Sequence, residues 1–223
     1  MRILVIDDDK NISSLLEEGL ELACYAVDVA NDGEDGSYLA RTNEYDVVIL
    51  ENRLPEKQGI NVCREIRESG KTMPIIILSV ISDVEVKTRL LDECADDYMT
   101  KPFSLRELQA HIRAVLRRPH LLQSDVVKVG DLTLDTKTRR VTRGAQKIRL
   151  TRTEYMLLEY LMRNQGIPLR RDKIIEHVWD MDANPFSHTL DTHILLLRRR
   201  IDGAGKQPLI RTVHGVGYTI DDA

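Results

Sequence analysis

The feature that most constrains the fold is a fivefold alternation of short apolar runs and helical patterns in the first half of the chain. The apolar runs fall at residues 3–6, 26–29, 47–50, 74–78 and 97–100. Continuous apolar strands of this kind are buried on both faces, which is typical of a parallel sheet covered by helices. Right-handed crossovers then predict an α/β doubly wound, flavodoxin-like sheet of five parallel strands, with its site at the carboxyl ends of the strands.

Helices are expected between these strands, from the recurrence of apolar residues at helical spacing. The first has Asn11 or Asp9 placed to cap its start, and the others cover residues 32–42, 60–68, 84–93 and 104–117, with Ser104 capping the last. The alternation ends at residue 118. These limits define a first domain of residues 1–118 and a linker of residues 119–125.

The second half of the chain, residues 126–223, has a different pattern. Short strand-like pieces separated by turns fill residues 126–150, and helices are predicted at residues 151–163, 171–179 and 187–201. Thr151 and Glu154 have the spacing of a capping box at the first of these helices. A β-hairpin over residues 209–220 turns at His214-Gly215. This half is predicted to be an α+β domain.

Charge divides the chain in the same place. Residues 1–118 hold 15 Lys and Arg against 23 Asp and Glu, a net charge of −8, whereas residues 119–223 hold 17 against 13, a net charge of +4. An acidic half joined to a basic half suggests one part for cations or control and one part for polyanions. No apolar run is long enough to span a membrane, and the acidic start is unlike a signal peptide, so a cytoplasmic protein with no membrane partner is expected.

The three cysteines are odd in number, widely spaced and without a metal-ligand pattern. Cys24, Cys63 and Cys94 are therefore interpreted as reduced packing residues of a cytosolic protein.

Charged and hydroxyl side chains follow four of the five predicted strands, where they are expected to converge. Clustered carboxylates repel one another unless a cation lies among them, and hard oxygen ligands suit Mg²⁺. A lysine and a hydroxyl beside such a site fit an incoming phosphoryl group, with the carboxylate after the third strand as nucleophile. The residues concerned are Asp7, Asp8, Glu51, Ser79, Tyr98 and Lys101.

On these residues the first half resembles the receiver domain of two-component response regulators, and the whole chain is similar to the OmpR/PhoB class, which joins a receiver to a winged helix-turn-helix. The resemblance implies that Asp7, Asp8, residue 51 and the Arg53 carbonyl surround Mg²⁺. It also implies that Lys101 contacts the phosphoryl group, and that Ser79 and Tyr98 act as a switch pair. A sensor histidine kinase would phosphorylate an aspartate at position 51.

Position 51 departs from that pattern because it is Glu. The extra methylene carries the carboxylate about 1.5 Å further into the pocket, out of register for in-line attack. We therefore expect no phosphate acceptance and a weak or absent Mg²⁺ site. Glu51 is then a natural loss of phosphorylation or an introduced substitution that imitates the phosphorylated state. The intact remainder of the pocket favours the substitution.

The resemblance also implies a homodimer through the fourth helix, fifth strand and fifth helix. His111 stands where the class usually has an arginine and Cys94 where it usually has a glycine, so a weakened dimer is expected. The charged residues of this face are Lys87, Asp92, Asp96, Asp97, Glu107, His111 and Arg113.

In the second half, the helix over residues 187–201 is expected to enter the major groove of promoter DNA, and the hairpin to act as a wing. Leu195 and Leu196 either contact thymine methyls or pack against the sheet. RNA polymerase is a further candidate partner. The DNA-binding set is His193, Leu195, Leu196, Arg198, Arg199, Arg200, Arg211 and His214.

The predicted function is a DNA-binding transcriptional regulator controlled by its receiver, and not an enzyme. Two alternatives remain open. A regulator that works without phosphorylation keeps the DNA domain and drops the kinase. A Mg²⁺-dependent phosphohydrolase would use the same strand-end carboxylates, but the run Asp7-Asp8-Asp9-Lys10-Asn11 departs from the motif of haloacid dehalogenase-type phosphatases at its last position.

Overall fold

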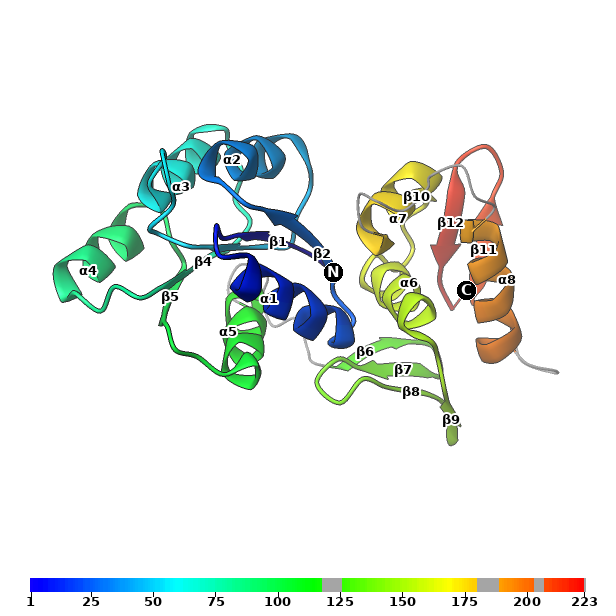
Figure 1. Cartoon of the computed structure of the whole chain (residues 1–223). Coiled ribbons are helices and arrows are strands. Elements are labelled where there is room, and N and C mark those ends of the chain that lie inside the picture. Colours follow the sequence, from blue (N-terminus) through cyan, green and yellow to red (C-terminus); the bar gives the residue numbers. More distant parts are fainter. Residues whose placement is uncertain (118–125, 180–188, 203–206, 223) are drawn as a thin grey trace. The chain divides into compact units, whose positions relative to one another are not determined.

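A computed structural model of the chain describes residues 1–117, 126–179, 189–202 and 207–222. The chain divides into two compact units, residues 2–123 and residues 124–223 with Met1, and each is described by itself (Figure 1). The predicted linker, residues 119–125, lies outside the described residues, as does Ser187, so the predicted domain limits stay predictions. Among the described helices, none is both long and apolar enough to cross a membrane.

The first unit is built on a five-stranded parallel sheet, as the sequence predicts. Its strand order is β2-β1-β3-β4-β5, with each pair of neighbours in parallel register. The doubly wound arrangement is thereby confirmed, and the first, third, fourth and fifth strands lie side by side. The strands are β1 (Arg2–Ile6), β2 (Ala26–Ala30), β3 (Val47–Leu50), β4 (Ile75–Ser79) and β5 (Asp97–Thr100).

Helices cover both faces of this sheet (Figure 1). Alternate side chains of β1 point to opposite faces of the sheet. Ile3 and Val5 pack with the buried faces of α1 and α5, while Leu4 and Ile6 pack with those of α2 and α3. This division explains why the strands are apolar throughout rather than alternating. The helices are α1 (Lys10–Leu22), α2 (Gly33–Thr42), α3 (Gly59–Glu68), α4 (Val84–Glu93) and α5 (Leu105–Arg117).

The start of α1 differs in detail from one expectation. Asp9 is the N-cap, and its Oδ1 accepts a hydrogen bond from the backbone N–H of Asn11 at 2.9 Å. Asn11 lies inside the helix and is not its cap. A cap residue must precede the first helical turn to reach the free N–H groups. Ser104 does cap α5, since its hydroxyl accepts from the N–H of Glu107 at 3.1 Å.

The second unit has an antiparallel sheet of order β6-β7-β8-β9, helices, and a small antiparallel sheet of order β10-β12-β11. Thr151 and Glu154 form the predicted capping box. Gly215, with φ 75°, supports the hairpin turn between β11 and β12. The elements are β6 (Val126–Val129), β7 (Leu132–Asp135), β8 (Arg140–Arg143), β9 (Gln146–Ile148), α6 (Arg152–Arg163), β10 (Leu169–Arg170), α7 (Arg171–Val178), α8 (Thr189–Ile201), β11 (Ile210–Val213) and β12 (Gly217–Ile220).

Two of the three cysteines are joined, which corrects the expectation that all are reduced. Cys63 of α3 and Cys94 at the C-cap of α4 form a disulfide, with their Cα atoms 5.9 Å apart. Cys24 is free. The two cysteines are 31 residues apart in the sequence, so their pairing could not be predicted from spacing. They meet because α3 packs against the end of α4.

Candidate functional site

The sheet order brings the predicted pocket residues together at the carboxyl ends of β1, β3, β4 and β5. Lys101, just after β5, reaches across the pocket: its Nζ donates to Oδ2 of Asp7 and to Oε2 of Glu51, each at 2.7 Å. Both carboxylates are buried, with 2% of Asp7 and 4% of Glu51 exposed. One ammonium group therefore bridges two buried acids that would otherwise repel each other.

The remaining oxygen of Glu51 is also occupied. The hydroxyl of Ser79 donates to Glu51 Oε1 at 2.6 Å, and the backbone N–H of Arg53 donates to the same atom at 2.8 Å. Ser79 is completely buried, so its hydroxyl depends on this partner. The Glu51 carboxylate thus engages the hydroxyl and the ammonium that the sequence assigns to a phosphoryl group.

Burial and ion pairing oppose each other in this cluster. Burial raises the pKa of Asp7, and hydrogen bonds from Lys101 and from the Asp9 backbone only partly offset this rise. Burial by itself would lower the pKa of Lys101, but hydrogen bonds to Asp7 and Glu51 outweigh it and raise that pKa. The charged form of the lysine is therefore held in place by the two acids.

The predicted Mg²⁺ ligands do not close around a cation. Among the residues that the structure describes, no group of three His, Cys, Asp or Glu side chains has a metal-binding arrangement. The side chains of Asp7 and Glu51 face Lys101 instead, and Asp8 is exposed. The lysine ammonium supplies the counter-charge that a divalent ion would otherwise supply, so the donor set as placed does not fit Mg²⁺.

Ser79 and Tyr98, the predicted switch pair, meet at one short segment. The Tyr98 hydroxyl donates to the carbonyl of Ile81 at 2.7 Å, and Ile81 N–H reaches the Ser79 hydroxyl at 3.5 Å. Tyr98 points inward, with 6% of it exposed, and burial raises its pKa. Lys87 of α4 lies 5.0 Å from the centre of the Tyr98 ring. The pocket is therefore connected to α4 and β5 through named contacts.

The predicted dimer face is only partly free. Asp97 is 2.6 Å from His111 Nδ1. Asp96 turns inward: its Oδ2 pairs with Arg67 of α3 at 2.7 Å and accepts from the N–H of Ile75 at 2.8 Å. Asp96 thus fixes β5 against α3. The other predicted members Asp92, Glu107 and Arg113 have no ion pair within the part of the chain described.

One residue of the pocket was missed in the sequence. Gly59, at the start of α3, donates its N–H to the carbonyl of Asn52 at 2.8 Å. A Cβ at this position would lie 2.5 Å from the carbonyl oxygen of Glu51, so only glycine permits the acceptor loop to pass so closely. Its signal was a glycine placed between a polar turn and a helix.

In the second unit, the outward face of α8 is mixed apolar and basic. Leu195 and Leu196 are 50% and 36% exposed, so part of each side chain is open to contact with a ligand. Arg199 is also exposed. His193 is half-buried, and its ring lies 5.6 Å from that of Trp179. Leu195, Leu196 and Arg199 thus form an exposed stripe on this helix.

The other two arginines of the run make hydrogen bonds within the unit, although Arg200 is also exposed. Arg198 donates to the carbonyl of Ile210 at 3.2 Å and to Thr212 Oγ1 at 2.9 Å. Arg200 donates to Glu154 Oε1 at 2.9 Å and to the carbonyl of Arg149 at 3.0 Å. At the wing, Arg211 pairs with Asp221, and His214 is exposed at the turn.

Arg143 was not foreseen, although it holds the end of α8. It is 3% exposed and donates to Asp131 at 2.8 Å and to Asp202 at 2.9 Å. It also donates to the carbonyls of Ile201 and Gln207, each at 2.6 Å. Nothing in the sequence indicates this role, because Arg143 follows Arg139 and Arg140 in an ordinary basic run.

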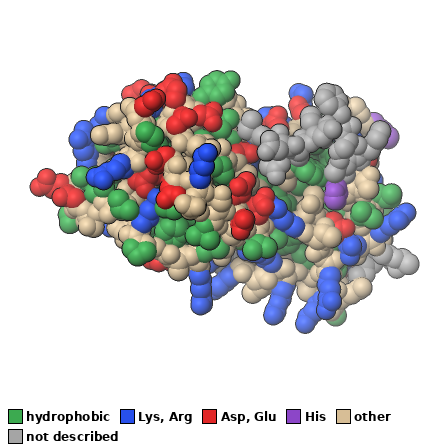
Figure 2. All heavy atoms as spheres, in the orientation of Figure 1, with side chains coloured by type: hydrophobic (Ala, Val, Ile, Leu, Met, Phe, Trp, Pro, Cys, Tyr) green, Lys and Arg blue, Asp and Glu red, His purple; other side chains and the backbone are tan. Residues whose placement is uncertain are grey.

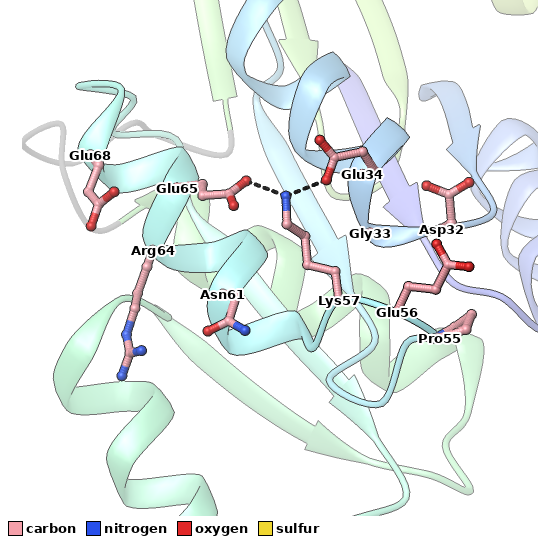
Figure 3. Close-up of a pocket in the computed structure, with 10 residues that line it drawn as sticks. All are labelled: Asp32, Gly33, Glu34, Pro55, Glu56, Lys57, Asn61, Arg64, Glu65 and Glu68. Atoms are coloured by element: carbon pink, nitrogen blue, oxygen red, sulfur yellow. Dashed lines mark hydrogen bonds and ion pairs between the residues drawn. The ribbon is translucent and has the colours of Figure 1, made fainter.

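A cavity of about 530 Å³ lies between α2 and α3 (Figure 3). Its lining is mainly acidic, but Lys57 extends between Glu34 and Glu65 and donates to them at 2.6 and 2.8 Å. Arg64, also in the lining, donates to Glu93 at 2.7 Å. The lining holds five carboxylates against these two cations and so keeps a negative charge, and none of the acceptor-pocket residues lines it.

Comparisons with known proteins agree with this architecture. Residues 3–113 match the response regulator receiver domain, and residues 145–220 match the C-terminal domain of transcriptional regulatory proteins. The response regulator MprA of Mycobacterium sp. (strain KMS) is 41% identical over 99% of this chain and 97% of its own length. Similar solved structures include a two-component response regulator from Clostridium difficile, 32% identical with TM-score 0.52 over 54% of this chain and 99% of that one. A Francisella response regulator receiver domain is 34% identical, with TM-score 0.51 over 53% of this chain and 98% of that one.

The chain belongs to the two-component response regulators of the OmpR/PhoB class. It is a transcriptional regulator with a receiver and a DNA-binding domain, not an enzyme, and the phosphohydrolase alternative is rejected. Figure 2 shows the matching division of charge: acidic side chains are spread over the receiver, and Lys and Arg side chains gather along one edge of the C-terminal unit.

Proposed function

We propose that the carboxylate of Glu51 stands in for a phosphorylated acceptor, so that the receiver supports DNA binding without phosphoryl transfer. The observation that carries this proposal is the contact of Glu51 with both Ser79 and Lys101, at 2.6 and 2.7 Å. In the family these two side chains contact the phosphoryl group. Whether Glu51 arose naturally or was introduced, the same contacts follow from its length.

The pocket needs no Mg²⁺ in this state. The ammonium of Lys101 lies between Asp7 and Glu51, and a divalent ion would have to displace it from both. Asp8 and the Arg53 carbonyl would then be the remaining ligands. A sensor histidine kinase can still dock on such a receiver, but the receiver offers no aspartate at position 51 for the kinase to phosphorylate.

The regulated partner is double-stranded promoter DNA, bound in the cytoplasm by a homodimer that forms through α4, β5 and α5. We assign base contacts to the stripe Leu195, Leu196 and Arg199, and backbone contacts to the wing around Arg211 and His214. This stripe carries a single arginine, which gives a monomer few charge contacts. Specific binding then requires two half-sites. RNA polymerase is a further partner of the DNA-bound form.

The test compares position 51 as Glu, Asp, Gln and Ala. A binding site is first obtained by selection from random duplexes with the Glu51 chain, and affinity is measured by fluorescence anisotropy at fixed salt. Glu51 is expected to bind most tightly, and Glu51→Asp to match it only after treatment with Mg²⁺ and a small phosphodonor. Equal affinity in all four chains would favour the alternative, a regulator whose DNA binding ignores the receiver pocket.

A further inference from the structure

The disulfide between Cys63 and Cys94 lies at the joint between α3 and α4. Cys63 is fully buried and Cys94 is 8% exposed, and the Cα separation of 5.9 Å is within the usual range for a disulfide. Both belong to the core cluster that contains Leu90 and Tyr98. The bond therefore connects two helices through the core, at the point where α4 leads into β5.

Helix α4 is weakly anchored without this bond. Of its ten residues only Leu90 is buried, whereas the equally long α3 buries Val62, Cys63 and Ile66 besides its first glycine. Elements that bury few apolar side chains open locally at low free-energy cost. The C-terminal end of α4 is thus the place where one covalent bond has the largest effect.

Polar contacts across the same joint are weaker. Arg64 donates to Glu93 at 2.7 Å, and Arg67 donates to the carbonyl of Cys94 at 3.0 Å. The side chains of Arg64 and Glu93 are 39% and 32% exposed, and exposed ion pairs contribute little because solvent screens them. The disulfide is the one covalent restraint among these contacts, and the hydrogen bonds of Arg67 to Cys94 and Asp96 add a polar restraint.

We propose that Cys63 and Cys94 are a reversibly oxidised pair that controls the mobility of α4, with a small-molecule disulfide as oxidant. The thiolate of Cys94 attacks one sulfur of the small disulfide, forms a mixed disulfide and releases one thiolate. The thiolate of Cys63 then attacks the Cys94 sulfur and releases the second. Two protein thiols are oxidised, the small disulfide is reduced to two thiols, and the two protons end on those products.

The bond acts on the switch face through short connections. Cys94 precedes Tyr98 by four residues, and Lys87 of α4 lies over the Tyr98 ring at 5.0 Å. In the oxidised chain α4 is held against α3 and the face of α4, β5 and α5 is fixed. In the reduced chain α4 moves more freely. Disulfides of cytosolic proteins are typically transient and redox-sensing rather than structural, which fits a control role.

The consequence for DNA binding rests on the proposed function, whereas the sulfur chemistry does not. The full chain is equilibrated with reduced or oxidised glutathione, quenched with acid, unfolded, alkylated and weighed intact, because Cys63 and Cys94 are buried in the folded receiver. Oxidised protein is expected to carry one alkyl group, on Cys24, and reduced protein three. Reduction is expected to speed amide exchange in residues 84–93 and to lower the receiver melting temperature by about 10 °C.

Matched variants separate the pair from the third cysteine. Cys24→Ser should keep the full redox response, while Cys63→Ser and Cys94→Ser should exchange like reduced protein in both buffers. Cys94→Gly, the residue usual at this place in the class, is a second variant if a serine at the helix end impairs folding.

Three alkylated cysteines after treatment with excess oxidised glutathione would overturn the proposal. So would a disulfide that forms without changing exchange in residues 84–93. If exchange changes but DNA affinity does not, the redox pair stands and the proposed role of the receiver face in DNA binding is contradicted.

Discussion

Replacing Glu51 with Asp withdraws the carboxylate by about 1.5 Å, the length of one C–C bond. The contacts of Glu51 with Ser79 and Lys101, now 2.6 and 2.7 Å, then stretch to about 4 Å, beyond hydrogen-bonding distance. Hydrogen bonds to charged groups contribute about 1.5–3 kcal/mol each. Lys101 keeps Asp7 as a partner, so we expect the receiver to lose on the order of 2 kcal/mol of unfolding free energy in the absence of Mg²⁺.

The same change should create a response to Mg²⁺. A retracted carboxylate leaves room between itself, Asp7 and Lys101, and a ligand at 100 times its dissociation constant stabilises a protein by about 2.7 kcal/mol. Glu51→Asp is therefore expected to recover stability in Mg²⁺ and to accept phosphate from a small phosphodonor. The Glu51 chain should show neither effect. Glu51→Gln keeps the side-chain length without the charge and is the matched control.

The assay can separate the two units because the only tryptophan, Trp179, lies in the second. Receiver unfolding is followed by amide exchange in β1, β3 and β4, and Trp179 fluorescence reports on the second unit, where no change is expected. Equal stability of the Glu51 chain and the Glu51→Asp variant without Mg²⁺, or equal stabilisation of both by Mg²⁺, would refute the account of the pocket.

Three further predictions concern other residues. Hydrogen bonds to Asp7 and Glu51 raise the pKa of Lys101 above 10.5. The stabilisation that charged Lys101 gives the receiver is therefore complete below pH 10.5 and is lost as the pH rises through the pKa of Lys101 in the folded state. Alkaline unfolding followed by circular dichroism should lack this loss in Lys101→Met. Replacing thymine by deoxyuracil in a selected site should weaken binding about fourfold per methyl contacted by Leu195 or Leu196, and not in their alanine variants. Arg143→Met should remove about 3 kcal/mol or more from the second unit, measured by Trp179 fluorescence, since Asp202, whose side chain is 8% exposed, loses its charged partner.

Much of the pocket could be predicted because its determinants are local. A continuous apolar run identifies a buried strand, the residue after it lies at the carboxyl end, and right-handed crossovers fix the neighbours. Asp7, Glu51, Ser79 and Lys101 therefore had to converge. The sequence could not predict that Lys101 inserts between Asp7 and Glu51. That contact depends on side-chain conformations and on the desolvation of both carboxylates.

The basic run shows a second kind of limit. Arg198, Arg199 and Arg200 are indistinguishable as letters, yet helix geometry points them in three directions. Arg198 donates to Thr212 of β11 and Arg200 donates to the capping-box Glu154, while Arg199 and Arg200 are both exposed. A count of charges does not tell which of the three arginines also hydrogen-bonds within the unit, since that depends on tertiary packing.

The pocket and the cysteine pair bear on the same question of control. A phosphorylated aspartate is reversible, whereas the negative charge of Glu51 is permanent and its oxygens are already bound by Ser79, Lys101 and the Arg53 amide. On the proposed function, such a receiver is not switched at position 51, because the donors that would bind a phosphoryl group already bind Glu51. A reversible input could then act on α4, the helix with a single buried side chain, and a disulfide at Cys94 would be such an input.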